Sequence, residues 1–275
     1  MKIVDLSVLV QNSPSEPMKI KMHRLTHDKG AKKYCRGLLW NRRLPLFQRI
    51  STFLWKVFSG NWLKPSDFPN SQFLSLDTVT LTTHMGTHVD APIHYGPLCE
   101  GKEARSIDDL PLEWFFAEAV RLDLRHKKIG NNITAKDLEE ALAAIPYTLK
   151  ANVIVLIWTG TDKKWGTPSY FREAPGLDRS AVEWLVKQGI KIVGIDTYGM
   201  DRPFDIMVAE FLKTRDPNIL WPAHFFGRES EYVHLERLAN LELLPSCGFK
   251  VSCFPIKLKG LDASWVRAVA LIDEE

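Results

Sequence analysis

The stretch THMGTHVDAPIH, residues 83–94, holds three of the chain's eight histidines together with one carboxylate. His84, His88 and Asp90 stand at positions n, n+4 and n+6, and Gly86 lies between the two histidines. Imidazole and carboxylate donors together favour Zn²⁺, Mn²⁺ or Fe²⁺ over Ca²⁺ and Mg²⁺, which prefer oxygen ligands alone. The stretch therefore predicts a metal site. The competing interpretation is a surface loop whose histidines bond to backbone groups.

The backbone of this stretch is predicted to be a loop at the end of a strand. On a helix His84 and His88 would share a face, but position 85 is Met rather than the Glu of an HExxH zinc site. The segment Asp90-Ala91-Pro92 also opposes a helix, because the residue before a proline is pushed out of the α region. Residues 73–82 alternate between apolar and polar side chains, so we expect them to form the strand that leads into the loop.

The pattern HxGTHxDAPxH, from His84 to His94, resembles the signature of the cyclase-like metal-dependent hydrolases, the family that contains bacterial kynurenine formamidase and isatin hydrolase. Other segments resemble the family in the same order along the chain: VDLS (4–7), WTG (158–160), VGIDT (193–197) and Asp201. The resemblance covers most of the chain except about residues 28–72. It implies an α/β protein with one domain over residues 1–275, in the swivelling β/β/α fold of the kynurenine formamidase and cyclase type.

The resemblance also implies a set of functional residues. It gives five metal ligands and one proton-transfer residue: His84, His88 and Asp90 for a first ion, His224 and Glu236 with Asp90 for a second, and His94 free to accept and donate a proton. We expect one or two ions, with Zn²⁺ first and Mn²⁺ as the alternative. An imidazole with a pKa near 6.5 also suits the proton transfer to a leaving amine.

The second half of this set has a competing candidate. His224 and Glu236 are twelve residues apart, which reproduces the spacing of the family's second metal position. His234 lies two residues before Glu236 and would share a face with it if the segment is extended. In a third interpretation these histidines lie on the surface and Glu236 faces solvent.

Periodicity predicts helices and buried strands that alternate in the middle of the chain, with strands at both ends, which is typical of a mixed α/β domain. The expected strands cover residues 2–10, 73–82, 119–124, 152–158, 190–195, 249–257 and 266–272. The expected helices run from Thr134, as the N-cap, to about residue 144 and from 180 to 188. Residues 159–162 should form a second loop of the active site.

An amphipathic insertion is expected at about residues 28–72. From residue 44 to 58 the apolar side chains recur at helical spacing, and Arg49 and Lys56 occupy the other face. Tryptophans and arginines flank this helix. Three placements are consistent with this pattern: the helix packs on the core or on a partner subunit, forms a lid over the site, or lies on a membrane surface.

Composition excludes several classes of protein. The net charge of +3, from 36 basic and 33 acidic residues, is too balanced to predict a nucleic-acid partner. No segment reaches the roughly 20 apolar residues of a membrane span, and the N-terminus has no secretory pattern. The four cysteines lack CxxC spacing, so we expect free thiols in a reducing compartment, the cytoplasm.

Three functions are consistent with these observations. The first is metal-dependent hydrolysis of an amide, either an N-formyl arylamine or a cyclic amide, by a metal-activated water. The second is a metal-dependent cyclase or dehydratase that acts on a biosynthetic intermediate. The third is a metal-stabilised binding protein without activity. We expect a small-molecule substrate and a homo-oligomer, either a dimer or a tetramer.

Overall fold

The computed structural model describes residues 1–273, which form two compact units. The main unit comprises Met1–Lys19 and the chain from Thr82 onward, and the inserted unit is Ile20–Leu81. Every residue predicted to bind metal or transfer a proton belongs to the main unit.

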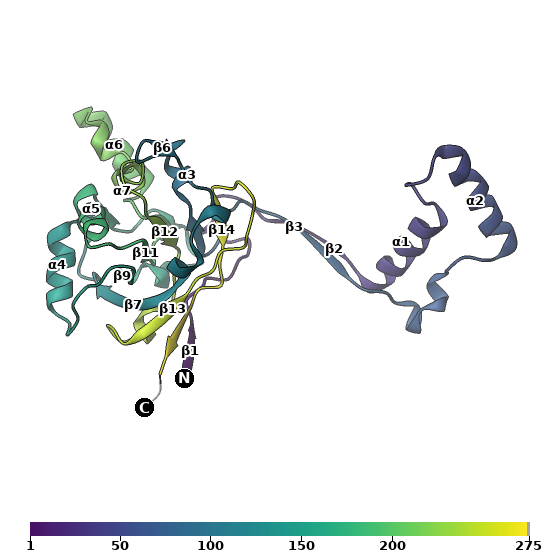
Figure 1. Cartoon of the computed structure of the whole chain (residues 1–275), viewed down its shortest axis with the longest axis horizontal. Coiled ribbons are helices and arrows are strands. Elements are labelled where there is room, and N and C mark those ends of the chain that lie inside the picture. The colour runs from purple at the N-terminus through teal and green to yellow at the C-terminus, as the bar shows by residue number, and fades with distance from the viewer. Residues whose placement is uncertain (274–275) are drawn as a thin grey trace. The chain divides into compact units, whose positions relative to one another are not determined.

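The main unit is built on a mixed sheet of nine strands (Figure 1). In spatial order these are β1 (Lys2–Asp5), β15 (Val269–Ile272), β13 (Phe249–Ser252), β7 (Phe116–Asp123), β9 (Ile154–Trp158), β11 (Ile192–Ile195), β12 (Val233–Glu236), β4 (His88–Asp90) and β14 (Ala263–Trp265). The strands β7, β9, β11 and β12 run parallel, and the remaining pairs are antiparallel. The predicted mixed α/β fold is confirmed.

The strand β9 divides the core of the main unit into two parts. All five of its residues are buried, as its uninterrupted apolar sequence predicts. Val155 and Ile157 point into one apolar cluster, and Ile154 and Leu156 point into the other, because side chains alternate along a strand. The helices α4 (Ala135–Ala143) and α5 (Arg179–Lys187) cover the first cluster (Figure 1).

The main unit has further α-helices, and short strands outside the nine-stranded sheet. The helices are α3 (Pro92–Tyr95), α6 (Phe204–Thr214) and α7 (Pro222–Phe226), and the two-residue strands are β5 (Leu98–Cys99), β6 (Lys102–Glu103), β8 (Asn132–Ile133) and β10 (Gly176–Leu177). Thr134 caps α4 as predicted: its hydroxyl accepts the N–H of Asp137, and the Asp137 carboxylate accepts the N–H of Thr134.

The inserted unit consists of a two-stranded ribbon and two helices. β2 (Lys21–Leu25) pairs antiparallel with β3 (Leu76–Thr80), and between them lie α1 (His27–Leu39) and the predicted amphipathic helix α2 (Leu46–Ser59). The unit is longer than the predicted 28–72 because the ribbon is part of it. The strand expected at 73–82 therefore pairs within this ribbon and not in the main sheet.

The helix α2 turns its basic side chains toward the rest of the inserted unit and its apolar side chains toward solvent. Its basic side chains bond to carbonyl groups of the inserted unit: Lys56 Nζ to that of Leu38 at 2.8 Å, and Arg49 to those of Arg42 and Leu44 at 3.0 Å. Its apolar side chains are exposed, Leu46, Phe47, Ile50, Leu54, Trp55, Val57 and Phe58. Among residues 1–273, no helix combines the length and apolar character needed to cross a bilayer.

Candidate metal centre

Two neighbouring strands carry most of the candidate donors. In the antiparallel pair of β4 and β12, His88 stands directly opposite Glu236, and Asp90 stands directly opposite His234. Because side chains alternate along a strand, these four residues share one face of the sheet. The predicted loop is therefore partly a strand, since His88–Asp90 pairs with both β12 and β14.

The three residues predicted for the first ion lie together. His84 Nδ1 is 2.8 Å from Asp90 Oδ1, and His88 Nε2 is 3.2 Å from the same oxygen. Gly86 makes the turn between the histidines possible: its φ is +68°, and a Cβ there would lie 2.6 Å from Cγ2 of Val10. A side chain at position 86 would therefore strain the backbone and collide with Val10.

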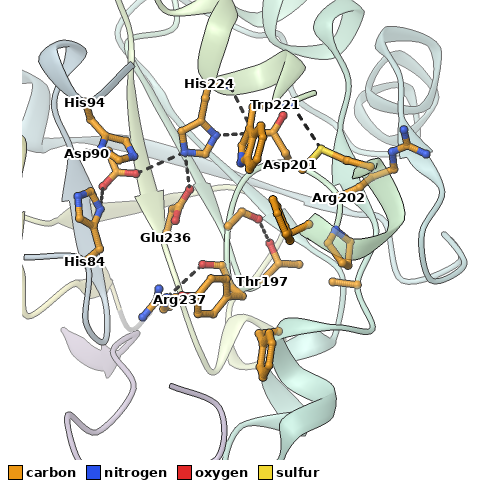
Figure 2. Close-up of a pocket in the computed structure, with 17 residues that line it drawn as sticks. His84, Asp90, His94, Thr197, Asp201, Arg202, Trp221, His224, Glu236 and Arg237 are labelled. Atoms are coloured by element: carbon orange, nitrogen blue, oxygen red, sulfur yellow. Dashed lines mark hydrogen bonds and ion pairs between the residues drawn. The ribbon is translucent and has the colours of Figure 1, made fainter. Parts of the chain in front are cut away.

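His224 approaches Asp90 from the other side. Its Nε2 lies 4.0 Å from Asp90 Oδ2 and 3.9 Å from Glu236 Oε1. Figure 2 shows the Asp90 carboxylate between the rings of His84 and His224. The structure thus brings all five predicted ligands into one cluster, namely His84, His88, Asp90, His224 and Glu236.

Each histidine among these five has its second ring nitrogen next to a polar partner. The contacts are His84 Nε2 with Asp262 at 3.1 Å, His88 Nδ1 with the Gly86 carbonyl at 2.8 Å, and His224 Nδ1 with Asp201. Metal-bound imidazoles commonly donate their other N–H to a carboxylate or a carbonyl, which fixes the tautomer and the ring orientation. The three rings are therefore oriented as metal ligands require.

The centre of the cluster contains polar atoms without partners. His88 Nε2 and both carboxylate oxygens of Asp90 are buried, and none makes a hydrogen bond of acceptable geometry. Burial disfavours the charge of Asp90, but His88 and His84 hold its pKa well below its usual range. Burial and Asp90 raise the pKa of Glu236, yet His234, His224 and His88 lower it to about 2. Two buried carboxylates and an unpaired imidazole nitrogen fit a cation between them.

His94 lies beside this cluster on α3. Its ring centroid is 4.2 Å from that of His84 and 5.4 Å from that of His224. Its nearest carboxylate contact is Asp262, 3.7 Å from Nδ1, which is longer than a hydrogen bond. Burial lowers the pKa of His94. His94 therefore faces the centre without being fixed by a strong hydrogen bond.

His234 is fully buried behind Glu236. Its Nδ1 lies 3.3 Å from Glu236 Oε1, and its Nε2 lies 2.8 Å from the hydroxyl of Tyr232. Burial lowers the pKa of His234, with a further contribution from the charge of His224. The remaining histidines, His23, His27 and His126, are exposed and lie outside the cluster.

A cavity of about 260 Å³ opens in front of the cluster (Figure 2). His84, Asp90, His94, His224 and Glu236 form its polar end. The rest of the lining includes four aromatic side chains, namely Phe171, Tyr198, Phe204 and Trp221. The expected loop at 159–162 does not line this cavity; its backbone is instead bonded to the buried Asp196.

Two further features were not predicted from the sequence. Asp262 contacts His84 and accepts a hydrogen bond from Thr83, although it stands far along the chain with no motif around it. Arg237 lines the cavity and forms a buried ion pair with Glu16, at 2.7 Å. The direct sequence neighbour of Arg237 is the candidate ligand Glu236, which is the one signal that could have identified it.

Sequence comparison finds relatives with named activities. The chain is 27% identical to the kynurenine formamidase of Paracidovorax citrulli over 223 residues, which are 78% of this chain and 92% of that protein. It is 26% identical to the isatin hydrolase of Roseibium aggregatum over 219 residues, which are 73% of this chain and 76% of that protein.

Structural comparison gives the same fold. A crystal structure of an isatin hydrolase bound to the product analogue thioisatinate superposes with a TM-score of 0.71 and 21% sequence identity, and the match covers 99% of this chain and 93% of that one. The family model named Cyclase, described as "Putative cyclase", matches residues 4–202. Because this match spans most of the sequence and includes the histidine motif, the chain belongs to the Cyclase family.

Proposed function

We propose that this chain is a metal-dependent hydrolase of an amide bond, with an N-formyl arylamine or a cyclic amide as its substrate. One observation carries the proposal: both oxygens of Asp90 are buried without hydrogen bonds and face imidazoles on two sides. The relatives named kynurenine formamidase and isatin hydrolase support the reaction class.

The proposed ligands form two positions that share Asp90. His84, His88 and Asp90 would hold the first ion, and Asp90, His224 and Glu236 would hold the second. Imidazole and carboxylate donors support Zn²⁺, with Mn²⁺ as the alternative. They disfavour Ca²⁺, which prefers oxygen ligands alone. When bound, such an ion polarises a carbonyl and lowers the pKa of water toward 7.

The protein's own side chains supply the rest of the chemistry. His94 would take the proton from the attacking water and deliver it to the departing nitrogen, because its ring faces the cluster and is not held by a strong hydrogen bond. The aromatic wall of the cavity would hold a flat ring and exclude water from the carbonyl. Substrate binding would thus place the amide between the metal ligands and His94.

We further propose a homo-oligomer in a reducing compartment such as the cytoplasm. The exposed apolar side chains of the inserted unit support an oligomer, because such a surface is unfavourable in water. The four unpaired cysteines of residues 1–273 support the compartment. Light scattering of the purified protein tests the first statement, and a tagged chain located in cells tests the second.

The reaction class is tested with labelled water. Zinc-loaded protein is incubated with N-formylkynurenine, other N-formyl arylamines and cyclic aryl amides in H₂¹⁸O, and the products are analysed by mass spectrometry. Hydrolysis must incorporate one ¹⁸O atom into the released acid, whereas the cyclase or dehydratase reaction requires no solvent oxygen. Metal-free protein is the control. The absence of turnover across the panel, with metal fully bound, would reject the hydrolase proposal.

A further inference from the structure

The hydrogen bonds around His234 determine which of its ring nitrogens carries a proton. The hydroxyl of Tyr232 lies 2.6 Å from the carbonyl oxygen of Ala223, and it must donate there because a carbonyl only accepts. The same hydroxyl lies 2.8 Å from Nε2 of His234. Its only proton is already used, so it can only accept in this second bond. Nε2 of His234 therefore carries a hydrogen.

In the neutral ring, the lone pair of His234 is then on Nδ1, and this atom faces acceptors. Glu236 Oε1 lies 3.3 Å away and Asp90 Oδ2 lies 3.8 Å away. Glu236 Oε1 already accepts the N–H of Met200 at 2.9 Å. A lone pair directed at two carboxylates in a fully buried site is unfavourable unless a cation lies between them.

The positions of the donors match such a cation. One donor atom from each of Asp90, His224, His234 and Glu236 lies within 4.8 Å of the other three. The four distances quoted above between these atoms run from 3.3 to 4.0 Å. Four ligands around Zn²⁺, each about 2.0–2.2 Å from the ion, would stand roughly 3.3–3.6 Å from one another. The longest of these four distances, 4.0 Å, exceeds this range by 0.4 Å.

We propose that Nδ1 of His234 is a fourth ligand of the second metal position, beside Asp90, His224 and Glu236. This inference rests on the metal-dependent function proposed above and assigns different roles to the two ions. Metal sites with four protein ligands are typically structural, whereas catalytic sites keep a position open for water. With His234 as a ligand, the second position would be closed by four protein side chains, and an ion there would link β4, β12 and α7. The first position, with three protein ligands, would keep a coordination position open for water.

The variant His234→Gln separates a ligand from a structural residue. The amide nitrogen of Gln can still donate to the hydroxyl of Tyr232, as Nε2 does, but nothing replaces Nδ1. The control is His126→Gln, since His126 is exposed and outside the cluster. Circular dichroism and thermal unfolding of the metal-free proteins establish that each variant folds. Zn²⁺ stoichiometry is measured by elemental analysis, and the affinity of each ion by competition with a chromophoric chelator.

We expect two ions in wild type and in His126→Gln, and one tightly bound ion in His234→Gln. Loss of an outer hydrogen-bond partner typically lowers metal affinity 10–100-fold. Loss of a ligand should cost more, so we expect the affinity for the second ion to fall by more than about 100-fold. A smaller loss, or none, would overturn the role of His234 as a ligand. If wild type binds no Zn²⁺ at all, the proposed metal-dependent function is rejected. That outcome differs from rejection of His234 as a ligand, in which wild type and His234→Gln bind Zn²⁺ alike.

A measurement on the wild-type protein does not depend on the folding of any variant. ¹⁵N-histidine NMR of the zinc-loaded chain should show His234 with a metal-bound Nδ1 and a protonated Nε2. A ring with hydrogens on both nitrogens would mean an imidazolium bonded to Glu236, which would overturn the inference.

Discussion

His88 is the most constrained of the candidate ligands. Its ring is completely buried, its Nδ1 faces the Gly86 carbonyl, and its Nε2 has no hydrogen-bond partner. We expect His88→Ala to lower the metal content by about one ion per chain, because the first position is left with two donors. Elemental analysis of the purified protein measures this. Equal metal in wild type and variant would show that His88 does not bind the ion.

His94 should behave differently from His88. His94 is not one of the proposed metal ligands and holds none of them by a strong hydrogen bond. The variant His94→Ala should therefore keep the metal content of wild type. Turnover should fall on the order of 10²-fold or more, as expected for the loss of a general acid–base group. Parallel elemental analysis and steady-state assays check both parts. A variant that loses metal and activity together would identify His94 as a ligand.

The candidate metal centre was predictable from the sequence only in part. The histidine motif identified the first donor group because its members are close in sequence. A loop of ordinary composition would not hold so many imidazole and carboxylate groups. Asp262 could not be found in this way, since its contact with His84 exists only because β14 pairs with β4. The sequence also could not show that His224 and His234 both reach the cluster, because this depends on where α7 lies relative to β12.

At the scale of elements, the prediction of buried strands was more successful than the prediction of connections. β9 and β11 were identified because continuous apolar runs of this length indicate strands that are buried on both faces. The strand β4 was missed because its three residues are two metal-ligand candidates and a valine, which carry no strand signal. Helix α1 was missed because its sequence is dominated by basic residues rather than by an apolar repeat.

Asp196 joins the ends of β9 and β11. Its carboxylate accepts the N–H groups of Thr159 at 2.9 Å and Gly160 at 2.7 Å. Asp196→Ala would leave both groups without this partner, at about 1–3 kcal/mol each. We expect a loss of about 3 kcal/mol in the free energy of unfolding, measured by urea denaturation at pH 6. The control Asp123→Ala removes an exposed pair with Arg125 and should cost about 1 kcal/mol or less.

This effect should depend on pH in one direction. Burial raises the pKa of Asp196 to about 7, above the value in the unfolded chain. The folded state therefore favours the protonated form, and the stability it contributes is lost as the pH rises through 7. The difference between wild type and Asp196→Ala should be smaller at pH 8.5 than at pH 6. An equal difference at pH 6 and pH 8.5 would mean that the native carboxylate is already ionised at pH 6.

At the scale of the whole molecule, the two units differ in charge. Residues 20–81 hold 11 of the 36 Lys and Arg residues but only 3 of the 33 Asp and Glu residues, which leaves 25 against 30 in the rest. The inserted unit therefore carries +8 and the main unit −5. The net charge of the whole chain, +3, does not show this difference. It appears only when the charges are counted for each unit separately.

The inserted unit can be removed without touching the candidate ligands. Lys21 and Thr80 are paired across the ribbon, so a short Gly-Ser linker can join Lys19 to Thr82. We expect this variant to keep its metal content, because every candidate donor lies in the main unit. Substrate affinity or oligomeric state should change, as steady-state kinetics and light scattering would show. If both stay unchanged, the unit contributes to neither.

The direct pairing of β4 with β12 limits how this sequence can change in evolution. Deleting or inserting one residue in either strand would turn two of the four donors to the opposite face of the sheet. The connecting segments carry no such restriction, since their length does not set the register. Descendants of this gene should therefore gain and lose residues in the connections, while the two short strands keep their length.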